Sequence, residues 1–271
     1  MKIYFYDKII LLWKLYKYFE KLPHNYRREF LFNPINVTRY EEFIILLKFI
    51  EEKQKRDLKI LDVSSPHMLA YILSNENTVL KTNIDEEESR FIKKNSRLIF
   101  KKENALNLSF NDNMFDLCYS ISVLEHIYKK YDKALAEIIR VTKPGGYIYI
   151  TFPVSNVHKE EWLNQDIYSD QYKNEGKTFF QYRFDERDVS FLIESLKNVT
   201  IELNCIFWER FNGAYDLTIN VLKKRFLFKH LSILKNYFIN VIVGLFLMRS
   251  TPGGFKKACS FGNMHLIFKK E

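Results

Sequence analysis

The feature that most constrains the fold of this chain is a change in the spacing of its apolar residues at Leu58. Beyond it, short apolar runs of strand length alternate with longer stretches of mixed polarity, of which residues 131–141 have the clearest helical spacing. The runs are residues 59–63, 78–84, 97–100, 115–122 and 147–152. Alternating strands and helices form βαβ units, whose right-handed crossovers place helices on both faces of a parallel sheet. The segment therefore predicts a doubly wound α/β fold.

The two ends of the chain follow other patterns. Residues 1–57 have apolar positions at helical spacing and predict an N-terminal helical layer. Residues 58–271 then form one α/β domain with insertions at about 153–184 and 209–260. The first insertion is polar and aromatic without a clear period, and the second contains an amphipathic stretch over residues 222–248. We also expect a helix at 185–196 and strands at 199–208 and 263–268.

The charge of the chain allows two interpretations. It has 42 Lys and Arg against 33 Asp and Glu, a formal charge of +9, which would suit a nucleic acid or an anionic membrane as partner. The lysines are scattered, however, and the tightest cluster, at residues 223–225, has three members. We therefore favour a uniformly lysine-rich protein, for which a nucleic acid is not the expected partner.

Cysteines and apolar segments indicate a cytoplasmic protein, with attachment to a membrane surface as the alternative. Cys118, Cys205 and Cys259 are far apart and form no CxxC or Cys/His pattern, so neither disulfides nor a metal site is expected. Lysines interrupt the apolar N-terminus, which is unlike a signal peptide. The apolar run at residues 237–248 has twelve residues, short of the roughly 20 that span a bilayer.

Three features follow one another across the predicted sheet. The first strand carries Asp62 near its end and runs into the small residues Ser64 and Ser65, a turn that brings backbone close to a nucleotide. Asp85 ends the next strand, where a carboxylate can accept hydrogen bonds from both hydroxyls of a ribose. A Pro-Gly-Gly turn later separates a helix from the fifth strand. Each feature alone is a weak signal, and their order makes them specific.

In this order the segments resemble the class I S-adenosylmethionine-dependent methyltransferases, especially the methyltransferase type 11-like group that includes small-molecule and quinone-biosynthesis enzymes. The resemblance rests on ILDVSSP, TNID, ENALNLSFNDNMFD, LCYSISVLEHI and RVTKPGGYIYITFP, and NMHLIFKK is similar to the family's seventh strand. It is strong over residues 58–152 and poor at the ends of the chain.

The resemblance implies a seven-stranded, mostly parallel sheet whose last strand is antiparallel. It also implies S-adenosyl-L-methionine bound across the carboxyl ends of the first, second and fourth strands. Carried over to this chain, the cofactor residues are Asp62, Ser64 and Ser65 at the amino-acid end, Asp85 at the ribose, Asn104 and Ala105 beside adenine, and Ser120, Ile121 and Ser122 behind the methionine part.

The loop after the first strand departs from the family pattern, because all three of its glycines are missing. Ser64, Pro66 and Met68 stand at the glycine positions. Pro66 suits the first turn of a helix, and Ser65 before it looks like a helix N-cap. Either the loop takes a tighter route with serine hydroxyls near the cofactor, or cofactor binding has been lost. We favour retained binding, since Asp62, Asp85 and the LEHI segment remain.

His126 is the leading candidate for a catalytic base, with Glu125 beside it. A base is needed when the methyl acceptor is a hydroxyl or an acidic carbon, and the pKa of an ordinary histidine lies near neutrality. The alternative, which we favour, is that both side chains only cap and brace the helix after the fourth strand.

The acceptor is expected to be a small molecule or a saccharide- or lipid-linked precursor. No Asn/Asp-Pro-Pro-Tyr signature and no Pro-Cys nucleophile follows the fourth strand, which argues against nucleobase methylation. Two alternatives stay open: a protein that kept the fold but lost catalysis, and an RNA methyltransferase, which the positive charge would suit.

Two segments could contact the acceptor or a partner. Aromatic residues within residues 165–182 could close over the cofactor as a lid, or they could be ordinary packing. The amphipathic stretch at residues 222–248 could lie on an anionic membrane surface. We favour its docking on the domain or on a second subunit of a homodimer.

Overall fold

The computed structural model describes residues 1–92, 97–224, 229–255 and 259–271. The chain divides into two compact units. Residues 56–205 and 263–271 form the first, here called the sheet unit, and residues 1–55 and 206–262 form the second, here called the helical unit.

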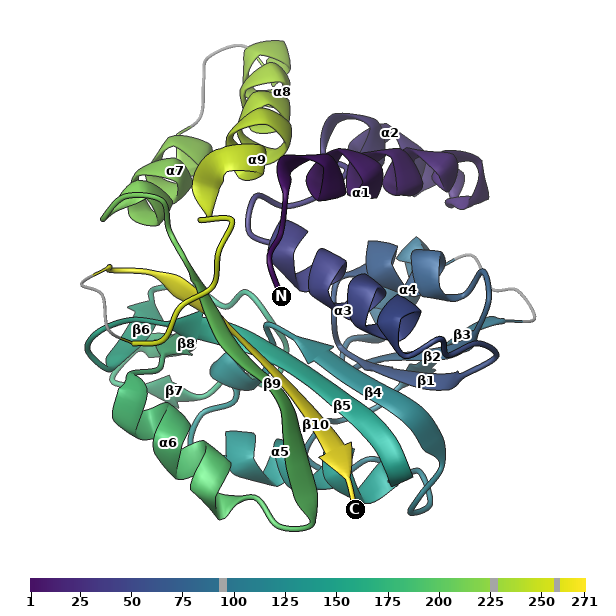
Figure 1. The fold of residues 1–271 in the computed structure, drawn as a ribbon. Helices are drawn as coiled ribbons and strands as arrows, with labels where there is room; N and C mark the ends of the chain where they lie inside the picture. The colour runs from purple at the N-terminus through teal and green to yellow at the C-terminus, as the bar shows by residue number, and fades with distance from the viewer. Residues whose placement is uncertain (93–96, 225–228, 256–258) are drawn as a thin grey trace. The chain divides into compact units, whose positions relative to one another are not determined.

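Within the described residues, seven strands form one sheet in the order β3-β2-β1-β4-β5-β10-β9 (Figure 1). They are β1 (Lys59–Val63), β2 (Thr78–Asn83), β3 (Leu98–Lys102), β4 (Phe115–Ile121), β5 (Thr142–Val154), β9 (Val199–Trp208) and β10 (Gly262–Lys270). The pairs from β3 to β5 are parallel, and the last strand runs antiparallel between β5 and β9. The predicted doubly wound sheet, with its antiparallel last strand, is confirmed.

The strand order reverses between β1 and β4. From β1 the chain moves through α4 (His67–Leu73) to β2, and from β4 it moves the other way through α5 (Tyr131–Val141) to β5. Right-handed crossovers in opposite directions place these two helices on opposite faces of the sheet (Figure 1). At such a reversal the loops at the carboxyl ends of the strands separate, and ligands of open α/β sheets bind there.

The first insertion contains a small antiparallel sheet that the sequence did not predict. Its strands, in the order β6-β8-β7, are β6 (Lys159–Leu163), β8 (Lys177–Arg183) and β7 (Lys173–Asn174). Only β8 is largely buried, whereas β6 and β7 are exposed or half-buried, so no alternation of apolar and polar residues marks them. The helix α6 (Glu186–Ser195) follows and begins with a capping box at Asp185.

The helical unit contains residues 1–55 of the predicted N-terminal layer together with the second insertion. Its elements are α1 (Phe5–Lys17), η1 (Phe19–Lys21), α2 (His24–Phe32), α3 (Tyr40–Glu52), α7 (Ala214–Lys223), α8 (Lys229–Tyr237), the π-helical η4 (Phe238–Val243) and α9 (Gly244–Leu247). The amphipathic stretch at residues 222–248 is thus several helical segments, and its residues Arg225, Phe226 and Phe228 lie outside the described part. No helix in the described ranges has the length and apolar character needed to cross a membrane.

Candidate functional site

The register of the parallel strands brings the predicted cofactor residues to one edge of the sheet. Val63 at the end of β1 is opposite Thr82 of β2, and the backbone N–H of Ser64 donates to the carbonyl of Thr82 at 3.0 Å. Asp85 follows the end of β2, and Ser122 follows the end of β4. These loops meet where the strand order reverses, as expected for a ligand site in this type of sheet.

The loop after β1 is held by inward-facing hydrogen bonds at Ser65. Its backbone N–H donates to Asp62 Oδ1 at 2.8 Å, and its Oγ accepts from the backbone N–H of Ile121 at 2.9 Å. The predicted N-cap role of Ser65 is therefore wrong: α4 begins at His67 after Pro66, with no side-chain cap, because the Ser65 hydroxyl faces β4 instead. Ser64 replaces a family glycine and adopts the left-handed region at φ 58°.

A row of three buried side chains lies directly beneath this loop. Lys81 of β2 and Tyr119 of β4 are both register partners of Asp62 in β1. The Asp62 Oδ2 atom accepts from Lys81 Nζ at 3.1 Å and from the Tyr119 hydroxyl at 2.8 Å, and all three residues are fully buried. Lys81 Nζ also donates to the carbonyl of Ser65.

The charge of the buried Asp62 carboxylate is neutralised by Lys81 inside the protein. The carboxylate can accept about four hydrogen bonds, and it accepts three here: from the Lys81 ammonium, the Tyr119 hydroxyl and the backbone N–H of Ser65. Burial and the neighbouring carboxylate raise the pKa of Tyr119 well above its usual value, so that its hydroxyl stays protonated and donates. Lys81 was missed by the sequence analysis, although a lysine in a strand buried on both faces requires a partner.

The predicted cofactor residues differ in how far they reach solvent. Asp62, Ser65, Ser120 and Ile121 are buried, so they support the loop and the strand ends from within. The half-buried members are Ser64, Asp85, Ala105 and Ser122, and Asn104 is exposed. The accessible groups therefore fit the nucleoside part of the cofactor, for which the resemblance assigns Asp85 to ribose and residues 104–105 to adenine.

Asp85 is an accessible carboxylate that hydrogen bonds already position. Its backbone N–H donates to Asn83 Oδ1 at 2.9 Å, which fixes the turn after β2. The hydroxyl of Ser169, from the first insertion, donates to Asp85 Oδ1. The side chain thus has a hydroxyl donor at the position where the resemblance places the hydroxyls of a ribose.

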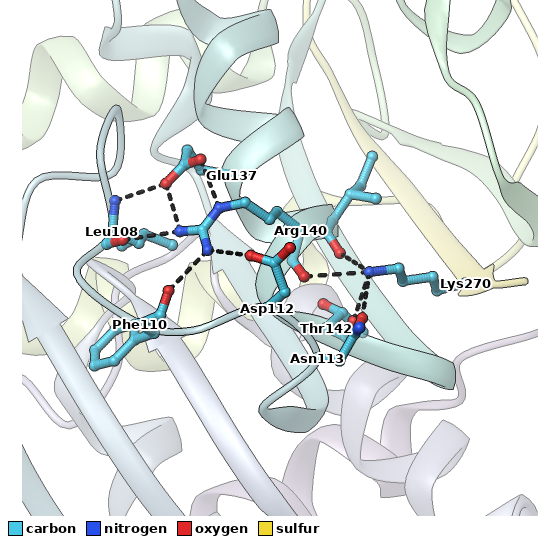
Figure 2. Close-up of polar contacts among 9 residues, drawn as sticks. Leu108, Phe110, Asp112, Asn113, Glu137, Arg140, Thr142 and Lys270 are labelled. Atoms are coloured by element: carbon cyan, nitrogen blue, oxygen red, sulfur yellow. Dashed lines mark hydrogen bonds and ion pairs between the residues drawn. The ribbon is translucent and has the colours of Figure 1, made fainter.

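The loop on the adenine side is fixed by Arg140 of α5 (Figure 2). Its guanidinium donates to the carbonyls of Leu108 and Phe110 at 2.8 and 2.7 Å, and to the Asp112 carboxylate at 2.7 Å. Glu137, one turn earlier, accepts from Arg140 and from the backbone N–H of Leu108 at 2.8 Å. Arginine suits this role because its planar fork can bind several oxygen atoms at once.

The carboxyl end of the same helix, close to Arg140, is held by the last strand. Lys270 Nζ donates to the carbonyls of Ile139 and Thr142, each at 2.8 Å, and to Asn113 Oδ1 at 2.8 Å (Figure 2). A cation at the carboxyl end of a helix satisfies carbonyls that lack a helical partner.

His126 lies at the end of η3 (Leu124–His126), which follows β4, and its protonation can be assigned from its contacts. Its Nδ1 atom is 2.6 Å from the carbonyl oxygen of Phe180. Because a carbonyl only accepts, Nδ1 carries the proton in the neutral ring and Nε2 is the basic atom. Glu125 is buried, with its Oε1 atom 3.9 Å from His126 Nε2.

An aromatic cluster adjoins His126 on the first insertion. Tyr168 packs edge-on against the His126 ring, with centroids 4.9 Å apart. Nearby, Tyr128 stacks on Tyr172 at 4.2 Å and contacts Phe179 at 4.8 Å. Phe179 is buried and acts as packing, whereas Tyr168 and Tyr172 are exposed. The arrangement places an apolar, aromatic surface beside the candidate base.

Comparison with known proteins identifies the central segment. Residues 63–150 match the family described as "Methyltransferase domain". An uncharacterized protein of Methanocaldococcus jannaschii is 33% identical over 131 residues, which cover 48% of this chain and 54% of that protein. A phthiotriol/phenolphthiotriol dimycocerosates methyltransferase of Mycobacterium tuberculosis is 31% identical over 96 residues, covering 33% and 35%.

Among solved structures, the MccD protein is similar with a TM-score of 0.52 and 13% sequence identity, covering 84% of this chain and 97% of that one. At this identity the similarity concerns the fold. The chain matches about half the length of the first curated relative and about a third of the second. The segment matched by the family, residues 63–150, contains the predicted cofactor residues except Asp62.

Proposed function

We propose that this chain, which belongs to the class I S-adenosylmethionine-dependent methyltransferases, transfers a methyl group to a small molecule or to a saccharide- or lipid-linked precursor. The observation that carries the proposal is the half-buried carboxylate of Asp85 at the end of β2, beside the reversal of strand order. The match of residues 63–150 to the methyltransferase domain supports it.

S-adenosyl-L-methionine, when bound, would supply a methyl group on a sulfonium whose neutral thioether is a good leaving group, so the protein mainly has to hold the reactants in line. Asp85 would accept hydrogen bonds from the ribose hydroxyls. Asn104 and Ala105 would flank the adenine, on a loop that Arg140 keeps in place. The Asp62–Lys81 pair would support the loop at residues 64–66 from beneath.

His126 has the geometry of a base for a hydroxyl acceptor. Its Nδ1–H donates to the carbonyl of Phe180, so Nε2 is the ring atom that would take up a proton from the acceptor, with the carboxylate of Glu125 3.9 Å away. The exposed rings of Tyr168 and Tyr172 beside it favour an acceptor with an apolar or planar face. A relative named for phthiotriol dimycocerosates supports a lipid-linked acceptor, and a relative named as a tRNA methyltransferase keeps RNA as the alternative.

Binding calorimetry with S-adenosylhomocysteine tests the cofactor site. We expect Asp85→Ala to weaken binding by roughly 1–3 kcal/mol, because the ribose would lose its acceptor. Asp132→Asn, a change of an exposed acid on α5, is the matched control and should leave binding unchanged. No heat from the wild-type protein at millimolar ligand would overturn the proposal.

Methyl transfer from radiolabelled S-adenosyl-L-methionine to fractions of a cell extract tests the acceptor class. We expect label in the organic-soluble or small-molecule fraction, and much less with His126→Asn than with the wild type. Label confined to the RNA fraction, with binding that falls steeply as salt rises, would replace the small-molecule acceptor by RNA.

A further inference from the structure

The first helix of the helical unit buries two charged side chains beside Leu11 and Leu15, and it leaves other apolar side chains exposed. Asp7 and Lys8 are buried in α1. Lys48 Nζ lies 2.7 Å from Asp7 Oδ2, and Lys8 Nζ lies 2.5 Å from Glu41 Oε1 of α3. Burying two charges of one helix is costly unless they are paired, and here both are. The ion pairs therefore fix which face of α1 points outward.

The outward face of α1 is an apolar stripe. Tyr6, Ile9, Ile10 and Trp13 are exposed and follow the i, i+3, i+4, i+7 spacing of a single helix face. Trp13 keeps 64% of its surface exposed. Scattered exposed apolar residues are normal in proteins, but a continuous stripe at helical spacing indicates a surface that something covers.

A second apolar stripe runs along α8, η4 and α9. Its exposed members recur at intervals of three or four residues: Leu231, Leu234, Phe238, Ile242 and Phe246. The ring of Phe246 stacks on Phe5 of α1 with centroids 5.5 Å apart, and Lys8 Nζ donates to the carbonyl of Leu245 at 3.0 Å. The two stripes therefore join, and we call them together the apolar face of the helical unit.

The helical unit also carries the excess of positive over negative charge in the chain. Its residues 1–55 and 206–262 contain 20 Lys and Arg against 9 Asp and Glu, a formal charge of +11. The sheet unit contains 22 against 24, a formal charge of −2. Lys17 lies over the Trp13 ring at 5.4 Å, so a cation directly borders the apolar face. The scatter of lysines along the sequence hides this division.

We propose that the apolar face of the helical unit binds the surface of an anionic lipid bilayer. Helices that lie in the interface of a membrane combine Trp, Phe and Leu on one side with flanking lysines, and anionic headgroups attract such lysines. A second copy of the chain fits this face less well, because each copy would bring a charge of +11 to the contact. The proposal does not depend on methyl transfer.

Flotation of the full-length chain with lipid vesicles tests the proposal. We expect binding to vesicles of phosphatidylcholine with 30% phosphatidylglycerol, weaker binding at high salt, and little binding to phosphatidylcholine alone. Trp13→Glu and Phe238→Glu should each reduce binding roughly tenfold or more, because each places a like charge against the headgroups. Phe191→Glu is the matched control, since Phe191 on α6 is 70% exposed but belongs to the sheet unit.

The results of these experiments distinguish a lipid bilayer from a second copy of the chain as the partner of the apolar face. Failure to float with anionic vesicles would overturn the proposal, as would equal loss of binding in Phe191→Glu. A wild-type dimer in sedimentation equilibrium that Trp13→Glu converts to a monomer, without vesicle binding, would assign the face to a second copy. Circular dichroism of each variant shows that it is folded, so loss of binding reports on the surface.

Discussion

Replacing Lys81 by methionine tests whether the buried row of Lys81, Asp62 and Tyr119 supports the cofactor loop. Methionine fills a similar volume but cannot donate, so the buried Asp62 side chain loses its cationic partner. Lys81 Nζ makes two hydrogen bonds, to Asp62 and to the carbonyl of Ser65. At roughly 1.5–3 kcal/mol for each charged bond, the expected loss is about 3–6 kcal/mol. Breaking buried ion pairs costs about 3–5 kcal/mol in general, which agrees.

The free energy of unfolding, measured by urea denaturation with circular dichroism, checks this value. Lys81→Met should lower it by about 4 kcal/mol, and the double variant Lys81→Met with Asp62→Asn should lower it by less, because no uncompensated charge is then buried. Lys102→Met is the matched control: this lysine also lies in a strand but is exposed, so we expect a change within about 0.5 kcal/mol. A loss below about 1 kcal/mol in the single variant, or an equal loss in the double variant, would refute the reasoning.

Three further predictions concern single residues. Gly146→Ala should destabilise the fold by roughly 1–3 kcal/mol, because a Cβ would lie 2.8 Å from the carbonyl oxygen of Lys143; an unchanged urea midpoint would contradict this. Burial lowers the pKa of His67, and a hydrogen bond from His67 lowers that of Glu88. Since the unfolded chain then binds protons more readily, stability should fall as the pH drops below about 6.5, and His67→Gln should flatten that dependence between pH 7 and 5. Finally, Ser169→Ala should tighten S-adenosylhomocysteine binding about two- to tenfold in calorimetry, because ribose would no longer displace the serine hydroxyl from Asp85; weaker binding would mean that Ser169 helps to hold the ligand.

The elements of the sheet could be predicted closely because they are buried on both faces. The strand at residues 59–63 and the helix at 131–141 have the predicted bounds, and the strand predicted at 147–152 extends to Thr142–Val154. The extension arises because the Pro-Gly-Gly turn continues into the strand as an irregular start with a register shift against β4. Apolar runs mark strands when both faces are covered, and this condition holds across the centre of the sheet.

Elements with one exposed face were harder to predict. The sheet of β6, β7 and β8 gave no apolar alternation, because aromatic residues occupy both buried and exposed positions in this insertion. The apolar face of the helical unit was also missed in part. On the sequence, α1 looks like any core helix. The structure shows that Asp7 and Lys8 are buried in ion pairs beside Leu11 and Leu15, which leaves other apolar residues of α1 exposed.

The missing glycines of the loop after β1 show why local sequence alone cannot predict the conformation of a binding loop. A glycine loop needs no help to adopt a left-handed angle, whereas Ser64 at φ 58° carries a cost of roughly 1–2 kcal/mol. The three hydrogen bonds that hold Ser65 can offset that cost, and one of their partners is Lys81, which lies 16 residues further along the chain. A glycine motif covers only the loop, and by this motif the loop is degenerate. Lys81, which holds the loop without the glycines, lies on the neighbouring strand β2, outside the motif.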